Sequence, residues 1–255
     1  MLKKIFSRTQ AQTAPLPAPA GPAPAAAAPA LRSSVADLTK KAAVSLTKHG
    51  LEHQKAAVYL VLDRSGSMRP FYEDGTVQYL AEQVLGLSRN LDDDGTVPVV
   101  FFSTGIDGTT EVSVSDYAGR IQAAHEQLGH MGRTYYDLAM DYVIKLHRAS
   151  DAAAKGRPAL VVFQSDGNPD NRPLTEDILR TASEEEDIFW AFVGYGTNVS
   201  FLTKLDHLKG RKVDNASHFH APDPRNVAVE ALYDGITGQF KTWLQATRGA
   251  GAPQH

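Results

Sequence analysis

An aspartate and two serines follow an apolar run near residue 60, at a spacing that could bind a metal ion. The run is Ala57–Leu62, and Asp63, Ser65 and Ser67 come directly after it. An unbroken apolar run of this length is typical of a strand buried on both faces of a parallel sheet. In open α/β sheets, ligands bind at the carboxyl ends of the strands. We therefore interpret these three side chains as half of the oxygen shell of a hard divalent cation.

The composition argues against several other kinds of site and partner. Lys and Arg total 26 against 29 Asp and Glu, and the formal charge of −3 gives no electrostatic support for binding nucleic acid. The absence of cysteine excludes disulfides, thiolate catalysis and Cys-ligated zinc or iron–sulfur sites. No stretch reaches the roughly 18 apolar residues of a membrane span, and no secretion-type apolar segment follows Lys3 and Lys4. We expect a cytoplasmic protein.

The chain divides into four parts by composition. Residues 1–30 are rich in Ala and Pro and are expected to be a disordered N-terminal tail. Residues 31–55 form a lead-in segment, helical or extended, with apolar residues at helical spacing. Residues 56–247 should form the folded domain, and residues 248–255 a flexible C-terminus.

Strands and helices alternate through the folded domain. The expected strands cover residues 57–62, 96–103, 111–114, 159–164, 188–193 and 213–220, and the expected helices cover 76–91, 117–128, 137–150, 175–186, 200–208 and a long segment from 229. This alternation predicts a doubly wound, mostly parallel α/β sheet with helices on both faces. Asp107-Gly108 is interpreted as a turn, which makes the short run 111–114 an antiparallel edge strand.

The pattern Asp63-x-Ser65-x-Ser67 at the end of the first strand resembles the metal-ion-dependent adhesion site of the von Willebrand factor A (vWA) domain. That family's pattern also has a threonine and a second aspartate, which Gly132-Arg133-Thr134 and Ser165-Asp166-Gly167 supply. The resemblance covers residues from about 55 to about 245. It implies that Asp63, Ser65, Ser67, Thr134 and Asp166 bind one divalent cation, and that a carboxylate from a partner protein takes an open coordination position.

The chemistry of these five residues agrees with that implication. Two carboxylates balance the charge of one divalent cation, and a set made only of oxygen ligands suits Mg²⁺, Ca²⁺ or Mn²⁺ rather than zinc or copper. We expect Mg²⁺, with Ca²⁺ or Mn²⁺ as alternatives. Gly66 and Gly167 would let the backbone approach the ion, and Asp170 is expected to support the site from outside the ligand set.

Each predicted ligand also has a purely structural alternative. Asp63, Ser67 and Thr134 could cap the helices that follow them, and Asp166 could form an Asx-turn before Gly167. Other polar groups are assigned structural roles. His218 and His220 are expected at a solvated strand end, and the Asp92-Asp93-Asp94 triplet is expected in a solvated loop.

Finer features point to a subfamily. The segments Arg64–Met68, Gly132–Tyr136, Phe163–Pro169 and Val44–Lys48 resemble the bacterial vWA proteins of tellurium-resistance (Ter) systems. The resemblance implies a metal-dependent protein-binding module in a tellurium-resistance or stress-response complex. Its partner would offer an Asp or Glu carboxylate to the metal, and other Ter proteins are candidates. No nucleic-acid partner and no membrane span are expected.

Two other functions remain open. A strand-end aspartate with Mg²⁺ also occurs in phosphohydrolases, and a scaffold with a vacant metal site would retain the fold alone. Ser65 stands where one class of phosphatase needs a second aspartate, and the chain has no nucleophile elbow, phosphate loop or dinucleotide-binding turn. We therefore expect no catalytic activity.

Overall fold

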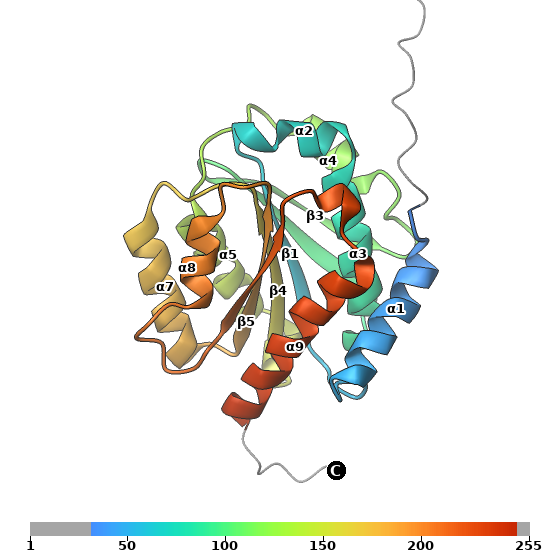
Figure 1. Ribbon diagram of the computed structural model, residues 1–255, viewed down its shortest axis with the longest axis vertical. Coiled ribbons are helices and arrows are strands. Elements are labelled where there is room, and N and C mark those ends of the chain that lie inside the picture. Colours follow the sequence, from blue (N-terminus) through green and yellow to red (C-terminus); the bar gives the residue numbers. More distant parts are fainter. Residues whose placement is uncertain (1–31, 249–255) are drawn as a thin grey trace, which may run out of the picture. The chain divides into compact units, whose positions relative to one another are not determined.

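The computed structural model describes residues 32–248, which Figure 1 shows in colour. The predicted tail of residues 1–30 lies outside the described residues. Of the predicted flexible C-terminus, residues 248–255, only Arg248 is described, and it is helical rather than irregular. The chain separates into the units Met1–Leu31 and Arg32–His255, and the second unit is described here by itself.

A six-stranded sheet forms the centre of this unit. Its strands are β1 (Ala57–Asp63), β2 (Thr96–Phe102), β3 (Ile106–Ser113), β4 (Ala159–Ser165), β5 (Ile188–Tyr195) and β6 (Ala216–Ala221). The order across the sheet is β3-β2-β1-β4-β5-β6, with β3 antiparallel to β2 and every other pairing parallel. The predicted fold class is confirmed, including the antiparallel edge strand. Because β1 lies between β2 and β4, the direction of winding reverses beside β1, at the predicted switch point.

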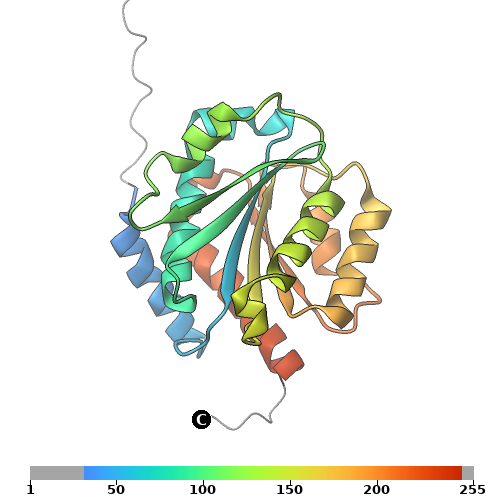
Figure 2. The same cartoon turned by 180° about the vertical axis from the view of Figure 1, so that it is seen from behind.

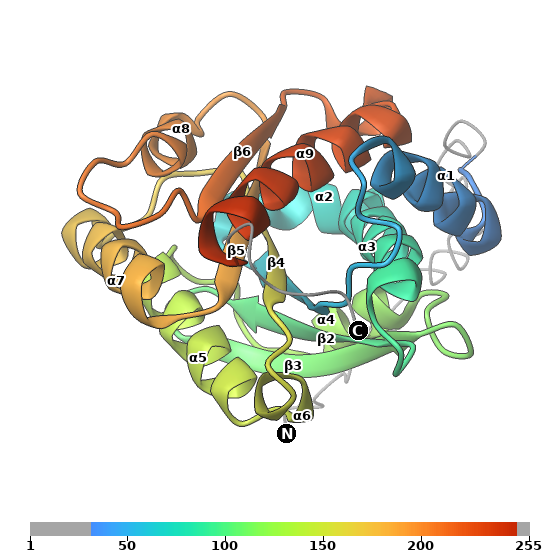
Figure 3. The ribbon, with the colours of Figure 1, turned by 90° about the horizontal axis from the view of Figure 1, so that it is seen from below.

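Helices cover both faces of the sheet. They are α1 (Val35–Lys48), α2 (Arg69–Glu73), α3 (Thr76–Leu91), α4 (Arg120–Gln127), α5 (Tyr136–Arg148), α6 (Asp151–Ala154), α7 (Arg172–Glu185), α8 (Ser200–Asp206) and α9 (Val229–Arg248). Figure 3 shows α1, α3 and α9 on one face and α5, α7 and α8 on the other. From behind, α5 lies in front of the sheet (Figure 2).

The central strands are apolar throughout because both of their faces are covered. All seven residues of β1 and all seven of β4 are buried. Leu60 and Val162 are paired in register and face the core under α3 and α9, while Val61 and Phe163, one position along, face the core under α5 and α7. Successive side chains of one strand therefore pack alternately into two separate hydrophobic cores, which explains the unbroken apolar run.

The lead-in segment contains α1, which packs along α3 and reaches α9. Ser34 caps its first turn by accepting a hydrogen bond from the Asp37 N–H at 3.2 Å. At its other end, Asp234 of α9 accepts a hydrogen bond from the Ser45 hydroxyl at 2.6 Å and pairs with Lys48. The segment is thus tied by side chains to the helix that ends the described chain.

The connection between β2 and β3 differs from the prediction. Asp107 and Gly108 were expected in a turn, but both lie within β3, where Gly108 pairs with Phe101. The chain turns earlier, at Ser103–Gly105, where the Ser103 N–H donates to the Gly105 carbonyl at 2.9 Å. A register shift after Phe101 accommodates the extra residue as a bulge. Asp-Gly is a common turn sequence, but pairing with β2 determines the conformation here.

We predict that Gly86→Ala destabilises the protein by about 1 to 2 kcal/mol in chemical denaturation, although alanine favours helices. A Cβ at Gly86 in α3 would lie 2.8 Å from the Cβ of Leu38 and 3.0 Å from the Leu38 backbone, so α1 would have to move away. Arg89→Ala, at an exposed position of the same helix, is the control and should change stability by less than about 0.5 kcal/mol. Equal effects of the two substitutions would contradict the close packing of α1 on α3.

Candidate metal centre

Three loops meet at the carboxyl ends of the parallel strands, and they carry the five predicted ligands. The first follows β1 and contains a short 3₁₀ helix, Gly66–Met68; the second precedes α5; the third follows β4. The first and second are joined by a hydrogen bond from the Gly66 N–H to the Gly132 carbonyl at 3.1 Å. The first and third are joined by the Ser67 hydroxyl, which donates to Oδ1 of Asp166 at 2.8 Å.

Asp63 is the buried centre of this arrangement. The side chain has no solvent exposure, and both carboxylate oxygens accept hydrogen bonds: Oδ1 from the Ser65 N–H at 2.6 Å and Oδ2 from the Ser165 hydroxyl at 2.5 Å. Burial raises the pKa of Asp63 to about 7, although the bonds from Ser165 and Ser65 lower it. The carboxylate is therefore well oriented but lacks a compensating positive charge.

Asp166 and the two serines complete one side of the site. The Ser65 and Ser67 hydroxyl oxygens lie 3.2 Å apart, and Ser67 contacts Asp166. Burial also raises the pKa of Asp166, and the Ser67 hydrogen bond opposes that shift. Among residues 32–248, no lysine or arginine forms an ion pair with Asp63 or Asp166. Two carboxylates with raised pKa values and two hydroxyls therefore lie together, and no lysine or arginine of residues 32–248 neutralises the carboxylates.

The structural alternatives for these ligands receive little support. The N-cap of α5 is Tyr135 rather than Thr134. The N-caps of the 3₁₀ helix and of α2 are Ser65 and Met68 rather than Asp63 or Ser67. None of these N-cap residues forms a side-chain capping hydrogen bond. An Asx-turn at Asp166 would need its carboxylate to accept the Asn168 N–H, and no such hydrogen bond forms among residues 32–248. The Gly167 N–H donates to the Ser165 hydroxyl at 3.2 Å.

Asp170 connects the second loop to the third. Its N–H donates to the Thr134 carbonyl at 2.8 Å, and its Oδ2 accepts the Thr134 N–H at 2.9 Å. Its other oxygen accepts from the Arg133 guanidinium, and together these bonds lower the pKa of Asp170. Asp170 therefore fixes the backbone at Thr134, and among residues 32–248 it forms no hydrogen bond to Asp63 or Asp166.

Ser165 and two tyrosines, none of them among the predicted site residues, support the loops. Ser165 bridges Asp63 and the Gly167 N–H. The Tyr72 hydroxyl donates to the Asp63 carbonyl at 3.1 Å, and the Tyr136 hydroxyl donates to the Gly167 carbonyl at 2.6 Å. Ser165 could have been suspected because it ends an apolar strand beside Asp166. Tyr136 ends the Gly132–Tyr136 segment that resembles the Ter proteins, but the sequence does not indicate its contact with Gly167, and nothing in the sequence marks Tyr72.

A buried arginine holds the chain immediately after Asp63. Arg64 is 1% exposed, and its guanidinium pairs with Asp107 at 2.7 Å and donates to His125 and to the Gly129 carbonyl. Asp107 also accepts from the Ser103 hydroxyl at 2.7 Å. Asp107 neutralises the buried Arg64 guanidinium. Arg64 therefore fixes the direction of the loop and does not pair with Asp63.

Gly132 allows the second loop to approach the end of β2. A Cβ at this position would collide with the Thr104 hydroxyl and would lie 2.8 Å from the Ser103 hydroxyl. The Thr104 hydroxyl also accepts the Arg133 N–H at 3.0 Å. The glycine before Arg133 is therefore required for this close contact, which determines where Thr134 enters the site.

The other polar clusters do not form a second metal centre. Among residues 32–248, no three His, Cys, Asp or Glu side chains gather in a group that could hold a metal ion, so the candidate centre depends on hydroxyls as well as on two carboxylates. The ring centroids of His218 and His220 lie 5.8 Å apart, but the two rings bind the Thr203 hydroxyl and the Gly196 carbonyl separately.

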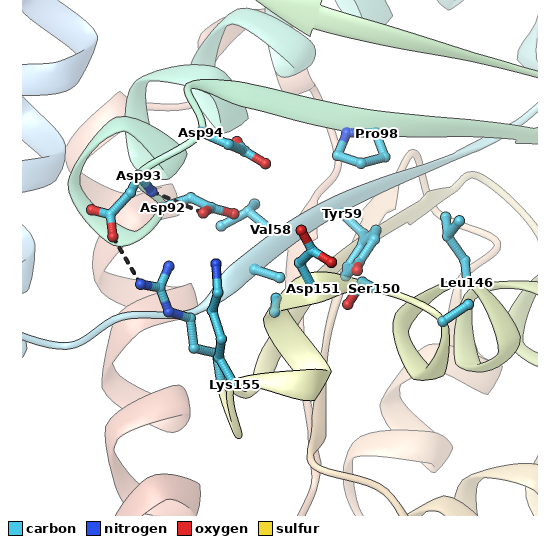
Figure 4. A pocket seen from close by; sticks show the side chains of 14 residues that line it. Val58, Tyr59, Asp92, Asp93, Asp94, Pro98, Leu146, Ser150, Asp151 and Lys155 are labelled. Atoms are coloured by element: carbon cyan, nitrogen blue, oxygen red, sulfur yellow. Dashed lines mark hydrogen bonds and ion pairs between the residues drawn. The ribbon is translucent and has the colours of Figure 1, made fainter.

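A cavity of about 540 Å³ opens at the opposite end of β1 (Figure 4). Asp92, Asp94 and Asp151 lie around it near Tyr59, and burial raises the pKa of Asp92. Asp93 pairs with Lys55 and Arg157, which lowers its pKa. The predicted solvated loop is therefore partly tied by ion pairs, and it lies away from the candidate metal centre.

With the fold and the site described, comparison with known proteins identifies the family. Residues 55–253 match the vWA-TerF-like family model, described as the vWA found in the TerF C terminus. The chain belongs to this family. Helix α1 precedes the matched region, and the Ter-type vWA assignment made from the sequence is confirmed.

The chain is also similar to a curated protein and to solved structures. The uncharacterized protein YcbR of Bacillus subtilis (strain 168) is 33% identical over 222 residues, which cover 84% of this chain and 88% of that protein. A solved von Willebrand factor type A structure from Catenulispora acidiphila is 14% identical with a TM-score of 0.51, covering 72% of this chain and 42% of that longer one. The manganese-loaded TRAP protein of Plasmodium vivax is 17% identical with a TM-score of 0.49, covering 71% of this chain and 74% of that one.

The helices of the vWA unit show no membrane-spanning segment. Between residues 32 and 248, none combines the length and the apolar character that crossing a membrane requires.

The raised pKa of Asp63 predicts that, without metal, Asp63→Asn changes the free energy of unfolding by an amount that depends on pH. Between about pH 4 and pH 7 the folded protein holds a proton that the unfolded chain releases, so this group lowers stability as pH rises through that range. Asparagine removes the ionisation. At pH 8 in EDTA we expect the variant to exceed the wild type in free energy of unfolding by about 4 kcal/mol, with little difference at pH 4, because the pKa rise of about three units is worth about 1.4 kcal/mol per unit.

Chemical denaturation at both pH values tests this, and the difference between the two proteins isolates Asp63 from the histidines. Added Mg²⁺ should stabilise only the wild type at pH 8. A difference that does not change with pH would show that the ionised carboxylate is not destabilising.

The Asp170 contacts predict that Asp170→Asn weakens Mg²⁺ binding about three- to tenfold in calorimetry, because the Thr134 loop loses its charge-assisted hydrogen bonds. Asp177→Asn, on the exposed surface of α7, is the matched control and should leave Mg²⁺ affinity unchanged. Unaltered affinity in Asp170→Asn would remove Asp170 from the site.

Proposed function

We propose that this vWA-TerF-like chain is a protein-binding module that holds one divalent cation and uses it to bind a carboxylate of its partner. The single observation that carries the proposal is the contact between the first and third loops. It brings Ser65, Ser67 and Asp166 together beside the buried Asp63, without a protein cation among the described residues.

The residues present fit a hard cation. Asp63 and Asp166 would balance its charge, directly or through water, while Ser65, Ser67 and Thr134 would supply hydroxyl oxygens. Mg²⁺ is the proposed ion, with Ca²⁺ and Mn²⁺ as alternatives. When bound, the ion would accept a carboxylate oxygen from outside the protein. The hydrogen bonds from Ser65 and Ser165 would keep Asp63 oriented toward the centre.

The proposed setting is a cytoplasmic complex of tellurium-resistance or stress-response proteins. The description of the matching family by its occurrence in TerF supports this assignment, as do the sequence segments around Asp63, Thr134 and Asp166. Other Ter proteins that present an exposed Asp or Glu are the proposed partners.

We further propose that the site is not catalytic. Asp63 would be the nucleophile of a strand-end phosphohydrolase, but its two oxygens already accept hydrogen bonds from Ser65 and Ser165. Ser65 also occupies the position where a general acid would be needed. Turnover of a generic phosphate ester in Mg²⁺ that disappears in Asp63→Asn would favour the hydrolase instead.

Calorimetry tests the metal site. We expect the wild type to bind one Mg²⁺, and Asp63→Ala or Asp166→Ala to reduce the affinity at least tenfold, because each removes a carboxylate from a two-carboxylate site. Asp151→Ala, an exposed aspartate beside the cavity at the other end of β1, is the control and should bind like the wild type. No binding of Mg²⁺, Mn²⁺ or Ca²⁺ by the wild type would end the proposal.

Partner capture tests metal dependence. The full chain, immobilised and exposed to lysate of its source cells, should retain a partner in Mg²⁺ and lose it in EDTA, and Asp63→Ala should fail to retain it under both conditions. An interaction that survives EDTA and Asp63→Ala alike would favour the scaffold with a vacant site.

A further inference from the structure

We infer that the partner segment carries several acidic side chains rather than one, because each loop of the candidate metal centre contains an exposed arginine or leads directly into one. They are Arg69, Arg133 and Arg172, called here the rim arginines. The inference rests on the proposed function and specifies the chemistry of the partner.

Each loop of the site contributes one rim arginine. Arg69 begins α2, two residues after Ser67; Arg133 precedes Thr134; and Arg172 begins α7, two residues after Asp170. The hydrogen bonds from Gly66 to Gly132 and from Asp170 to Thr134 hold these loops together. The three side chains therefore start from the same end of the sheet.

All three rim arginines are exposed, but their surroundings differ. The Arg133 side chain is 68% exposed and pairs with Asp170, so its charge is already compensated. The guanidinium of Arg172 lies 5.7 Å from the ring centre of Phe201 in α8, which limits its position without neutralising it. Arg69 lies close enough to His125 to contribute, after burial and Arg64, to lowering the pKa of that histidine.

Arg69 and Arg172 provide uncompensated positive charge. Neither forms an ion pair with an acidic side chain of residues 32–248, including Glu73, one helical turn from Arg69. With a divalent cation balancing Asp63 and Asp166, and with Asp170 balancing Arg133, the rim stays positive. A ligand with one carboxylate would bind the metal ion but leave Arg69 and Arg172 without acidic partners, whereas additional carboxylates on either side of the first could pair with them.

Two probe peptides test this inference with the full-length chain in Mg²⁺. One has nine residues with a single central aspartate flanked by two glutamines on each side; the other replaces those four glutamines with glutamates. We expect the glutamate peptide to bind at least tenfold more tightly at low salt in a fluorescence-polarisation titration. The advantage should shrink as salt rises, because exposed charge pairs are screened.

The double variant Arg69→Gln/Arg172→Gln assigns the effect to the rim. It should weaken the glutamate peptide about fivefold, while leaving the affinity for the single-aspartate peptide and for Mg²⁺ unchanged. The control, Arg89→Gln/Lys155→Gln, removes the same charge from exposed positions at the C-terminal turn of α3 and beside the cavity at the other end of β1. It should bind both peptides like the wild type.

Three outcomes would overturn the inference: equal affinity for the two peptides, no measurable binding of either peptide while Mg²⁺ binds, or equal losses in the rim and control variants. In each case Mg²⁺ calorimetry still reports separately on the metal site. If Mg²⁺ does not bind, the proposed function fails. The affinities for the two peptides, measured in EDTA, then decide whether the rim arginines bind the glutamate peptide more tightly without a metal ion.

Discussion

Burial of the Asp63 carboxylate is the constraint on which the rest of the site depends. Full desolvation of a carboxylate is costly, and here hydrogen bonds from Ser65 and Ser165 only partly compensate for it. The sheet accommodates the group because β2 and β4 flank it on both sides and fix the backbone at the end of β1. A fold optimised only for stability would replace such a group, so its presence favours a role in binding a cation.

The loops around Asp63 are held by contacts between their own backbones and side chains. Arg64 with Asp107 fixes the first loop, Gly132 against the end of β2 fixes the second, and Asp170 joins the second to the third. A binding centre needs ligands placed by rigid neighbours, and these contacts provide that support. These contacts within the protein fix the geometry of the candidate site.

The two ends of the sheet differ in how their charges are compensated. At the start of β1, Asp93 has two cationic partners, Lys55 and Arg157. At the carboxyl end, Asp63 and Asp166 have none among the described residues, while Arg69 and Arg172 stand nearby without acidic partners. Separated, uncompensated charges of opposite sign at one end are what a cation together with an acidic partner would neutralise.

The sequence by itself determined the order of the strands and of the helices other than the short α2 and α6, and the place of Asp63, Ser65 and Ser67 after β1, because these depend on local periodicity. The run 57–62 predicted a doubly buried strand, and helix α3 has the predicted bounds of residues 76 and 91. Only the tertiary structure decided that Asp107 lies in β3 beside the buried Arg64, 43 residues earlier, and that Ser165 binds Asp63 across 102 residues. Such pairings depend on which strands become neighbours, and pairing across the sheet outweighed the local turn preference of Asp107-Gly108.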